Sequence, residues 1–64
     1  MAIGSRIKQY IEDKGIKQKY LADQTGLTER CISHILNDKQ KPDFIKIKSI
    51  CDVLNVDINI FLQD

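Results

Sequence analysis

The segment QKYLADQTGLTERCISHILN, residues 18–37, constrains the fold of this chain more than any other stretch. It places a small residue, Ala22, shortly before Gly26, and an apolar residue, Ile32, in the stretch that follows the glycine. Two helices that cross steeply through a tight turn need a small residue where their backbones approach and a glycine where φ is positive. They also need apolar residues that hold the second helix on the core, and the buried side is completed by Leu21, Leu27 and Ile35. The spacing predicts two short helices and a tight turn.

Helical spacing of apolar residues also predicts a helix before this segment and the bounds of the two helices within it. The first helix is expected from about Gly4 to Lys14, and Gly15 ends it, with an apolar face formed by Ile3, Ile7, Tyr10 and Ile11. The next helix begins near Lys17 and stops at Gly26. Thr28 is an N-cap, and the helix after it buries Ile32, Ile35 and Leu36.

Two more helices are expected after the polar loop of residues 37–42, where Asn37 or Asp38 adopts the left-handed conformation that ends a helix. Asp43 caps the first of them and Asn55 ends it, with an apolar stripe of Phe44, Ile47, Ile50, Cys51 and Leu54. Asp57 caps the last short helix, whose apolar residues fold back on the core: Ile58, Phe61 and Leu62. The prediction is an all-α fold of five short helices without strands, in one domain over residues 1–64.

The composition agrees with a small folded domain. The chain has 64 residues, of which 42% are hydrophobic and 30% charged, and a chain of this length buries one modest core with little room for a deep catalytic cleft. No apolar run approaches the ~18 residues that span a bilayer, and the N-terminus lacks the layout of a signal peptide. We therefore expect a cytosolic protein without a membrane partner.

Charge is distributed unevenly along the chain. Residues 1–48 carry ten basic and six acidic side chains, a net charge of +4, whereas residues 49–64 carry three acidic side chains and none that is basic. The overall charge of +1 hides this asymmetry. The basic part can face a polyanion, and the C-terminal part cannot.

The segment 18–37 resembles the helix-turn-helix of the Cro and phage-repressor class of DNA-binding proteins, also called XRE-like. The likeness continues from IGSRIKQYIEDKG to KPDFIKIKSICDVLNVDINIFL and so covers nearly the whole chain. It implies a lambda-repressor-like domain in which the helix after Thr28 lies in the major groove. The base-contact residues that the resemblance implies are Glu29, Arg30, Ser33 and His34. Arg30 can pair with guanine O6 and N7, Glu29 can accept from cytosine N4, and His34 can donate to a purine N7.

The resemblance also implies a set of phosphate contacts. Gln18 matches the family's glutamine that binds phosphate and braces the major-groove helix, and Lys17 stands where the family often has a Ser or Thr cap. A lysine there is unfavourable for the helix dipole but useful beside a phosphate. The expected phosphate contacts are Lys17, Gln18, Lys19, Thr28, Asn37, Lys39 and Lys41, with Lys46 as a further candidate. Lys8, Lys14 and Lys48 are interpreted as solvated surface charges.

These features predict a sequence-specific regulator of transcription that binds double-stranded DNA. Repression is implied by the resemblance alone, as is the alternative of an antitoxin-type autoregulator. The near-palindromic operator expected for this class calls for two copies, so either residues 43–62 form a homodimer or the chain is the N-terminal part of a longer protein. A protein-interaction module that kept the fold without binding DNA is the other alternative, which the low net charge, Glu29 and the expected exposure of Ile45 and Ile60 favour. Val56 is also expected to be exposed, and these apolar residues are interpreted as a self-association patch.

Metal and enzyme chemistry find little support. Cys31 and His34 have the C-x-x-H spacing and Cys51 adds a third possible ligand, but a zinc site needs a fourth. As a thiol and base, Cys31 and His34 would lack an oxyanion hole and a third orienting group. We expect no enzyme activity, no cofactor and no small-molecule ligand, and we interpret both cysteines as reduced packing residues.

Overall fold

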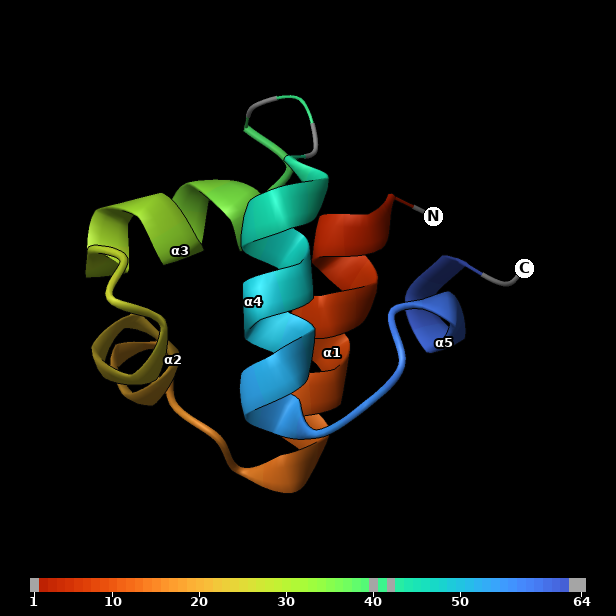
Figure 1. The fold of residues 1–64 in the computed structure, drawn as a ribbon, viewed down its shortest axis with the longest axis horizontal. Coiled ribbons are helices and arrows are strands. Elements are labelled where there is room, and N and C mark those ends of the chain that lie inside the picture. The colour runs from red at the N-terminus through yellow and green to blue at the C-terminus, as the bar shows by residue number, and fades with distance from the viewer. Residues whose placement is uncertain (1, 40, 42, 63–64) are drawn as a thin grey trace.

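The computed structural model describes residues 2–39, 41 and 43–62. Five helices follow one another, and the described residues contain no strand: α1 (Ile3–Lys14), α2 (Gln18–Thr25), α3 (Glu29–Leu36), α4 (Phe44–Leu54) and α5 (Asn59–Leu62). Helix α3 packs against α1 and α2, α2 also packs against α4, and α5 packs against α1. Figure 1 shows α2 and α3 on one side of the molecule and α5 on the other. The all-α prediction is confirmed.

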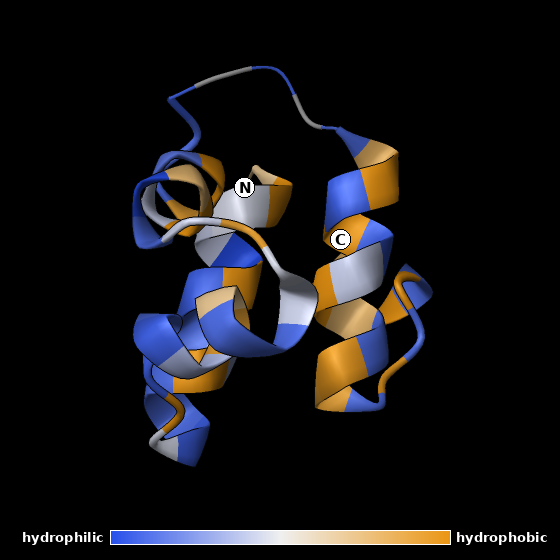
Figure 2. Ribbon diagram, turned by 60° about the vertical axis from the view of Figure 1, so that its left-hand side comes forward, coloured by the Kyte–Doolittle hydropathy of each residue, from blue (hydrophilic) through white to orange (hydrophobic). Residues whose placement is uncertain are grey.

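The core takes one face from every helix. Its buried members are Ile7, Ile11, Leu21, Ala22, Ile32, Ile35, Leu36, Ile47, Ile50, Cys51 and Phe61. Full burial of one Ile or Leu side chain is worth about 1.5–3 kcal/mol, so these residues supply most of the stability of so small a fold. Figure 2 shows bands of apolar and hydrophilic residues alternating along the helices, as expected of amphipathic helices packed around one core.

Helix ends lie close to where the local sequence predicts them. Gly15 and Gly26 are left-handed, with φ of 72° and 78°, and Asn55 ends α4 with φ of 58°. The Asp43 carboxylate accepts from the N–H groups of Ile45 and Lys46, and that of Asp57 accepts from the N–H of Asn59. After α3 the left-handed residue is Asp38, with φ of 57°, whereas Asn37 has φ of −99°. These caps satisfy backbone groups that a helix end leaves without partners.

The N-terminus of α1 is capped from the far end of α3. Ala2, at the N-cap position, offers no side-chain cap, but Asp38 Oδ1 accepts from the N–H of Gly4 at 3.1 Å. The other oxygen of Asp38 accepts from the Ser5 hydroxyl at 2.6 Å. A Cβ atom at position 4 would collide with the carbonyl oxygen of Ile35 and with this carboxylate. Gly4 therefore allows the start of α1 to pack directly on the end of α3.

Short helix α5 is held by α1. The rings of Tyr10 and Phe61 meet edge to face, with centroids 5.6 Å apart and planes at 87°. Nη1 of Arg6 donates to the carbonyl oxygen of Phe61 at 3.4 Å. A helix of one turn has little stability of its own, so these contacts from α1 account for its position.

Several details of the predicted burial are wrong. Phe44 and Leu62 are 57% and 48% exposed because each lies at the end of its helix, beyond the elements that cover the stripe. Gly26 is exposed, since a left-handed turn residue points its backbone outward. Val56 is half-buried rather than exposed, because the chain bends back after Asn55 and packs it against the core. Gln40 and Pro42, expected in the polar loop, lie outside the described residues.

Candidate nucleic-acid interface

The turn between α2 and α3 is organised by three residues in a row. The N–H of Gly26 donates to the carbonyl of Ala22 at 3.0 Å. The hydroxyl of Thr25 donates to the carbonyl of Leu21 at 2.7 Å and accepts from the N–H of Leu27 at 3.3 Å. Figure 1 shows α2 almost end-on while α3 lies across the view, so the two helices cross steeply. The helix-turn-helix expected from Ala22 and Gly26 is present, and the Thr25 hydroxyl adds a contact across the turn that was not predicted from the sequence.

Helix α3 has one buried and one outward face. Thr28 caps it as predicted, since its Oγ1 accepts from the N–H of Cys31 at 3.0 Å. The buried face consists of Ile32, Ile35 and Leu36. The four base-contact candidates share the other face, where Glu29 and Arg30 are exposed and Ser33 and His34 are half-buried. The structure therefore brings these four residues together.

Glu29 and Arg30 begin the outward face with opposite charges. Neither side chain has a hydrogen bond or ion pair with any residue that the structure describes, so Glu29 and Arg30 do not pair with each other. Both groups are available to a ligand. Because a carboxylate at this place repels phosphate, Glu29 restricts what can approach the first turn of α3.

The C-terminal end of α3 carries a chain of polar contacts. Lys8 Nζ, on α1, donates to Asn37 Oδ1 at 2.9 Å. Asn37 Nδ2 donates to the carbonyl of Ser33 at 2.9 Å and to its hydroxyl at 3.2 Å. Lys8 is thus not the purely solvated charge we had expected. No local pattern could have indicated this contact, since Lys8 and Asn37 are 29 positions apart.

The start of α2 presents the first group of expected phosphate contacts. Lys17 is its N-cap residue with φ of −88° and ψ of 148°, and it offers no side-chain cap. Lys17 and Lys19 are exposed and Gln18 is half-buried. The Gln18 side chain makes no hydrogen bond within the described part of the chain, so the expected brace to α3 is not formed. The phosphate role of all three residues stays a prediction.

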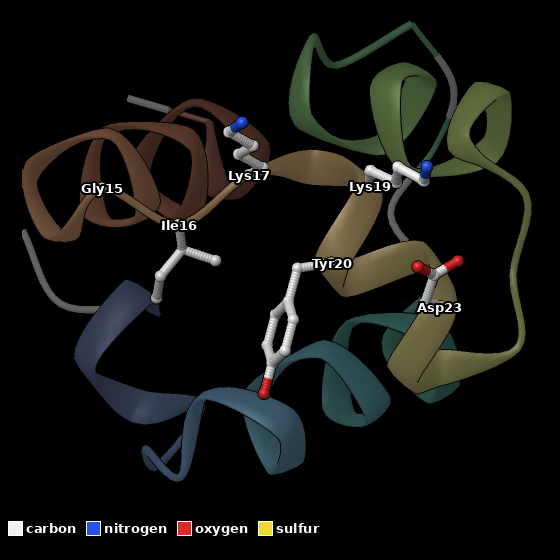
Figure 3. A pocket seen from close by; sticks show the side chains of 6 residues that line it. All are labelled: Gly15, Ile16, Lys17, Lys19, Tyr20 and Asp23. Atoms are coloured by element: carbon white, nitrogen blue, oxygen red, sulfur yellow. The ribbon is translucent and has the colours of Figure 1, made fainter.

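A shallow hollow adjoins these lysines. It has a volume of about 490 Å³ and is lined by Gly15, Ile16, Lys17, Lys19, Tyr20 and Asp23. Figure 3 shows that Ile16 and Tyr20 point to the same side, while Lys17 points away from the tyrosine ring. The hollow therefore combines an apolar part, formed by Ile16 and by Tyr20, which is 51% exposed, with the charged side chains of Lys17, Lys19 and Asp23.

The remaining lysines divide into two groups. Lys39 and Lys41, just beyond α3, are exposed, and Lys46 is half-buried in the first turn of α4. Lys14 lies over the Tyr10 ring, 5.6 Å from its centroid, and Lys48 pairs with Asp52 at 3.4 Å on α4. Lys14 and Lys48, which we interpreted as solvated, therefore have partners on their own helices.

The cysteines and His34 do not assemble into a site. Among the residues that the structure describes, no three His, Cys, Asp or Glu side chains come together as metal ligands. Cys51 lies in the core and is 1% exposed. Cys31 is a half-buried free thiol that packs against the core cluster. In the same part of the chain, no helix is long and apolar enough to cross a membrane.

Comparison with known families and structures decides the fold family. The family model described as "Helix-turn-helix" matches residues 7–61. The chain belongs to the XRE-type helix-turn-helix family. This family comprises DNA-binding regulators rather than enzymes, and membership supports a DNA-binding transcriptional regulator. The match covers α2 and α3 together with most of α1, all of α4 and most of α5, so it rests on more than the turn.

Solved structures of helix-turn-helix proteins resemble this one closely. A crystal structure of SinR, the master regulator for biofilm formation, in complex with DNA is 32% identical, with a TM-score of 0.82, covering 97% of this chain and 100% of that one. The N-terminal DNA-binding domain of SinR from Bacillus subtilis is also 32% identical, with a TM-score of 0.80, covering 97% and 91%. SinR in a complex with SinI is 31% identical, with a TM-score of 0.83, covering 98% of this chain and 62% of that one. No curated protein matches significantly.

Proposed function

We propose that residues 1–64 act as one helix-turn-helix domain that binds double-stranded DNA in a sequence-specific way and represses transcription. In this proposal α3 lies in the major groove, and its outward residues contact base edges: Glu29, Arg30, Ser33 and His34. The observation that carries it is the division of α3 into a buried face and an outward face, on which Glu29 and Arg30 have no partner among the described residues. SinR, the relative of known structure, has been crystallised with DNA.

Arg30 carries the largest share of base recognition in this proposal. It is exposed in the first turn of α3, where major-groove helices of this class contact bases, and its guanidinium has no partner among the described residues. A guanidinium matches the two acceptors of guanine, O6 and N7. Glu29 beside it favours a base that presents an amino group, such as cytosine.

In this proposal phosphate contacts come from the start of α2 and from both ends of α3. Lys17, Gln18 and Lys19 lie at the start of α2, and Thr28 lies at the start of α3, where its Oγ1 is already an acceptor and keeps its hydrogen for a phosphate oxygen. At the other end lie the exposed Lys39 and Lys41, with Asn37 beside them. The Asp38 carboxylate nearby is committed to Gly4 and Ser5, which limits its repulsion of phosphate.

We propose a homodimer on a near-palindromic operator. One domain of this size makes few phosphate contacts, and two copies about 34 Å apart reach two successive major grooves on one side of the duplex. Among the residues that the structure describes, the exposed large apolar side chains outside α2 and α3 lie on α4 and α5: Phe44, Ile45, Ile60 and Leu62. Ile45 is the most exposed of them at 82%. These residues support a self-association surface in the α4 and α5 region.

Binding to another protein is the second candidate function, and the same apolar residues favour it. A solved structure also shows SinR in a complex with the SinI protein. The two functions differ in their response to salt. Binding through several lysine and arginine contacts to phosphate loses affinity steeply with salt, by roughly 0.9 in log affinity per log unit of salt for each phosphate neutralised. An apolar protein interface is nearly insensitive to salt.

The test is selection of binding sites from a random pool of double-stranded DNA at about 0.1 M salt, followed by titration of the best site at several salt concentrations. The proposal expects enrichment of an inverted repeat and a steep salt slope. Enrichment of a single half-site would retain DNA recognition and overturn the dimer. Absence of any enriched sequence would overturn specific DNA binding and favour the protein-binding function.

A further inference from the structure

The carboxamide of Asn37 connects a lysine of α1 with a serine on the outward face of α3. Its oxygen accepts from Lys8 Nζ at 2.9 Å, and its nitrogen donates to the Ser33 carbonyl and hydroxyl at 2.9 and 3.2 Å. Asn37 follows the last residue of α3, and the Ser33 position is one turn earlier on the same helix. Both the oxygen and the nitrogen of the amide are thus engaged within the chain.

The lysine and the Ser33 carbonyl together determine which way the carboxamide points. An ammonium group has three donors and no acceptor, so it binds the amide oxygen and excludes the amide nitrogen. With the oxygen held by Lys8, the nitrogen must face Ser33. The alternative orientation would place two donors against each other and an acceptor against the Ser33 carbonyl, so the bonds to Lys8 and to that carbonyl would be lost.

The orientation of the carboxamide decides what the Ser33 hydroxyl offers to a ligand. A hydroxyl has one hydrogen to donate and two lone pairs that accept. In Ser33 a lone pair is occupied by the Asn37 nitrogen, and the hydroxyl hydrogen has no acceptor among residues 2–39, 41 and 43–62. A hydroxyl that already accepts a hydrogen bond is polarised toward donating one. Ser33 is therefore prepared as a donor on the outward face of α3.

We propose that Lys8 and Asn37 are positioning residues that make Ser33 a hydrogen-bond donor, so that α3 selects a base with an acceptor edge opposite Ser33. Guanine O6 and N7, adenine N7 and thymine O4 satisfy this donor, whereas the cytosine amino group does not. The inference rests on the proposed function, since it requires α3 to lie in the major groove. It gives Asn37 a role in base selection in place of a phosphate contact.

Asn37→Asp is the decisive variant. It keeps an oxygen for Lys8 but replaces the nitrogen facing Ser33 with a second acceptor, so the Ser33 hydroxyl turns its hydrogen inward and presents lone pairs to the base. Cytosine N4 or adenine N6 becomes the better partner. The added negative charge weakens all DNA sites alike, so the quantity to measure is the ratio of affinities among the four base pairs at each operator position.

Ser33→Ala and a matched pair of lysine variants complete the experiment. Lys8→Met removes one of the contacts that orient the carboxamide, whereas Lys48→Met removes the same charge from an exposed lysine on α4 that pairs with Asp52. Thermal unfolding is recorded for each variant to show that it is folded. Ser33→Ala is expected to flatten the base preference at one operator position about two- to tenfold, the contribution of one hydrogen bond. Asn37→Asp is expected to shift the preference at that position, and Lys8→Met to flatten it, while Lys48→Met leaves the ratios unchanged.

Two results would overturn the inference while leaving the proposed function intact. One is a wild-type preference that Ser33→Ala does not change at any position. The other is an Asn37→Asp protein that keeps the wild-type ratios and loses affinity uniformly, as a phosphate contact would. A wild-type protein without any base preference would overturn the proposed function and this inference together.

Discussion

The Asp38 carboxylate accepts a hydrogen bond from the backbone N–H of Gly4 at 3.1 Å, across 34 positions of the sequence. The same side chain binds the Ser5 hydroxyl and belongs to a left-handed residue with φ of 57°. An N-terminal cap ordinarily comes from the residue just before its helix, but the cap of α1 comes from Asp38, the residue that follows the C-cap of α3. The orientation of α3, which carries the proposed base contacts, is thereby tied to α1.

Replacing Asp38 should destabilise the fold. Asp38→Ala removes the cap of α1 and places alanine in a left-handed conformation that it adopts poorly, so we expect the free energy of unfolding to fall by about 1–2 kcal/mol. Urea denaturation measures this. Asp23→Ala is the matched control, because Asp23 is an exposed carboxylate on α2 without a hydrogen bond in the described residues. Equal stability of the two variants would refute the capping role.

The sequence could predict contacts between neighbouring residues but not contacts between residues that are far apart in the chain. Thr28, Asp43 and Asp57 cap the helices that begin beside them, and such caps are readable from a few adjacent residues. The contacts of Asp38 with Gly4 and of Lys8 with Asn37 join α1 to the end of α3. No spacing rule relates residues so far apart, so these contacts required the three-dimensional structure.

For the candidate site, the sequence predicted which residues face outward but not the hydrogen bonds that they make. The outward face of α3 follows from helical periodicity, which places Arg30 and His34 opposite the buried Ile32. What each side chain is bonded to does not follow from periodicity, and neither the Asn37 bonds to Ser33 nor the unpaired state of Glu29 was foreseen. Phe44 was misplaced because periodicity gives the face of a residue but not whether another element covers it.

Lys17 should affect stability and DNA binding in opposite directions. Its side chain gives α2 no cap and its charge opposes the helix dipole, so Lys17→Ser should raise the free energy of unfolding by about 0.5–1 kcal/mol. The same change removes a proposed phosphate contact and should lower the salt slope of DNA binding by about 0.9. Urea denaturation and a salt titration measure the two effects. An unchanged slope would remove Lys17 from the interface.

Ala22 should tolerate no larger side chain. It is 5% exposed on α2, which packs against both α3 and α4, so Ala22→Leu should overpack the core and cost about 1–3 kcal/mol. Gln24→Leu is the control, since Gln24 is exposed on the same helix. Thermal unfolding compares the two. If both variants melt at the temperature of the wild type, close packing at Ala22 is not what holds α2 in place.

The Cys51 thiol should make stability depend on alkaline pH. Burial raises its pKa above the ordinary value of 9.0, and the carboxylates of Asp52 and Asp57 raise it further, against a smaller opposite effect of Lys48. The folded state then holds the proton more tightly than the unfolded state, so stabilisation is complete below pH 9.0 and is lost as pH rises through the folded pKa. Urea denaturation from pH 8 to 10 should show a shallower loss for Cys51→Ala than for Cys31→Ala. Identical pH profiles would contradict this.

The central claim is that the outward face of α3 distinguishes DNA sequences, and the most direct test is the affinity of wild type and Arg30→Ala for the selected operator and for a scrambled duplex. We predict that Arg30→Ala loses about 1–3 kcal/mol on the operator and little on the scrambled DNA, while Lys17→Ala weakens both alike. An Arg30→Ala protein that loses the same free energy on both duplexes would show that Arg30 contacts only phosphate, and would contradict base recognition by this face of α3.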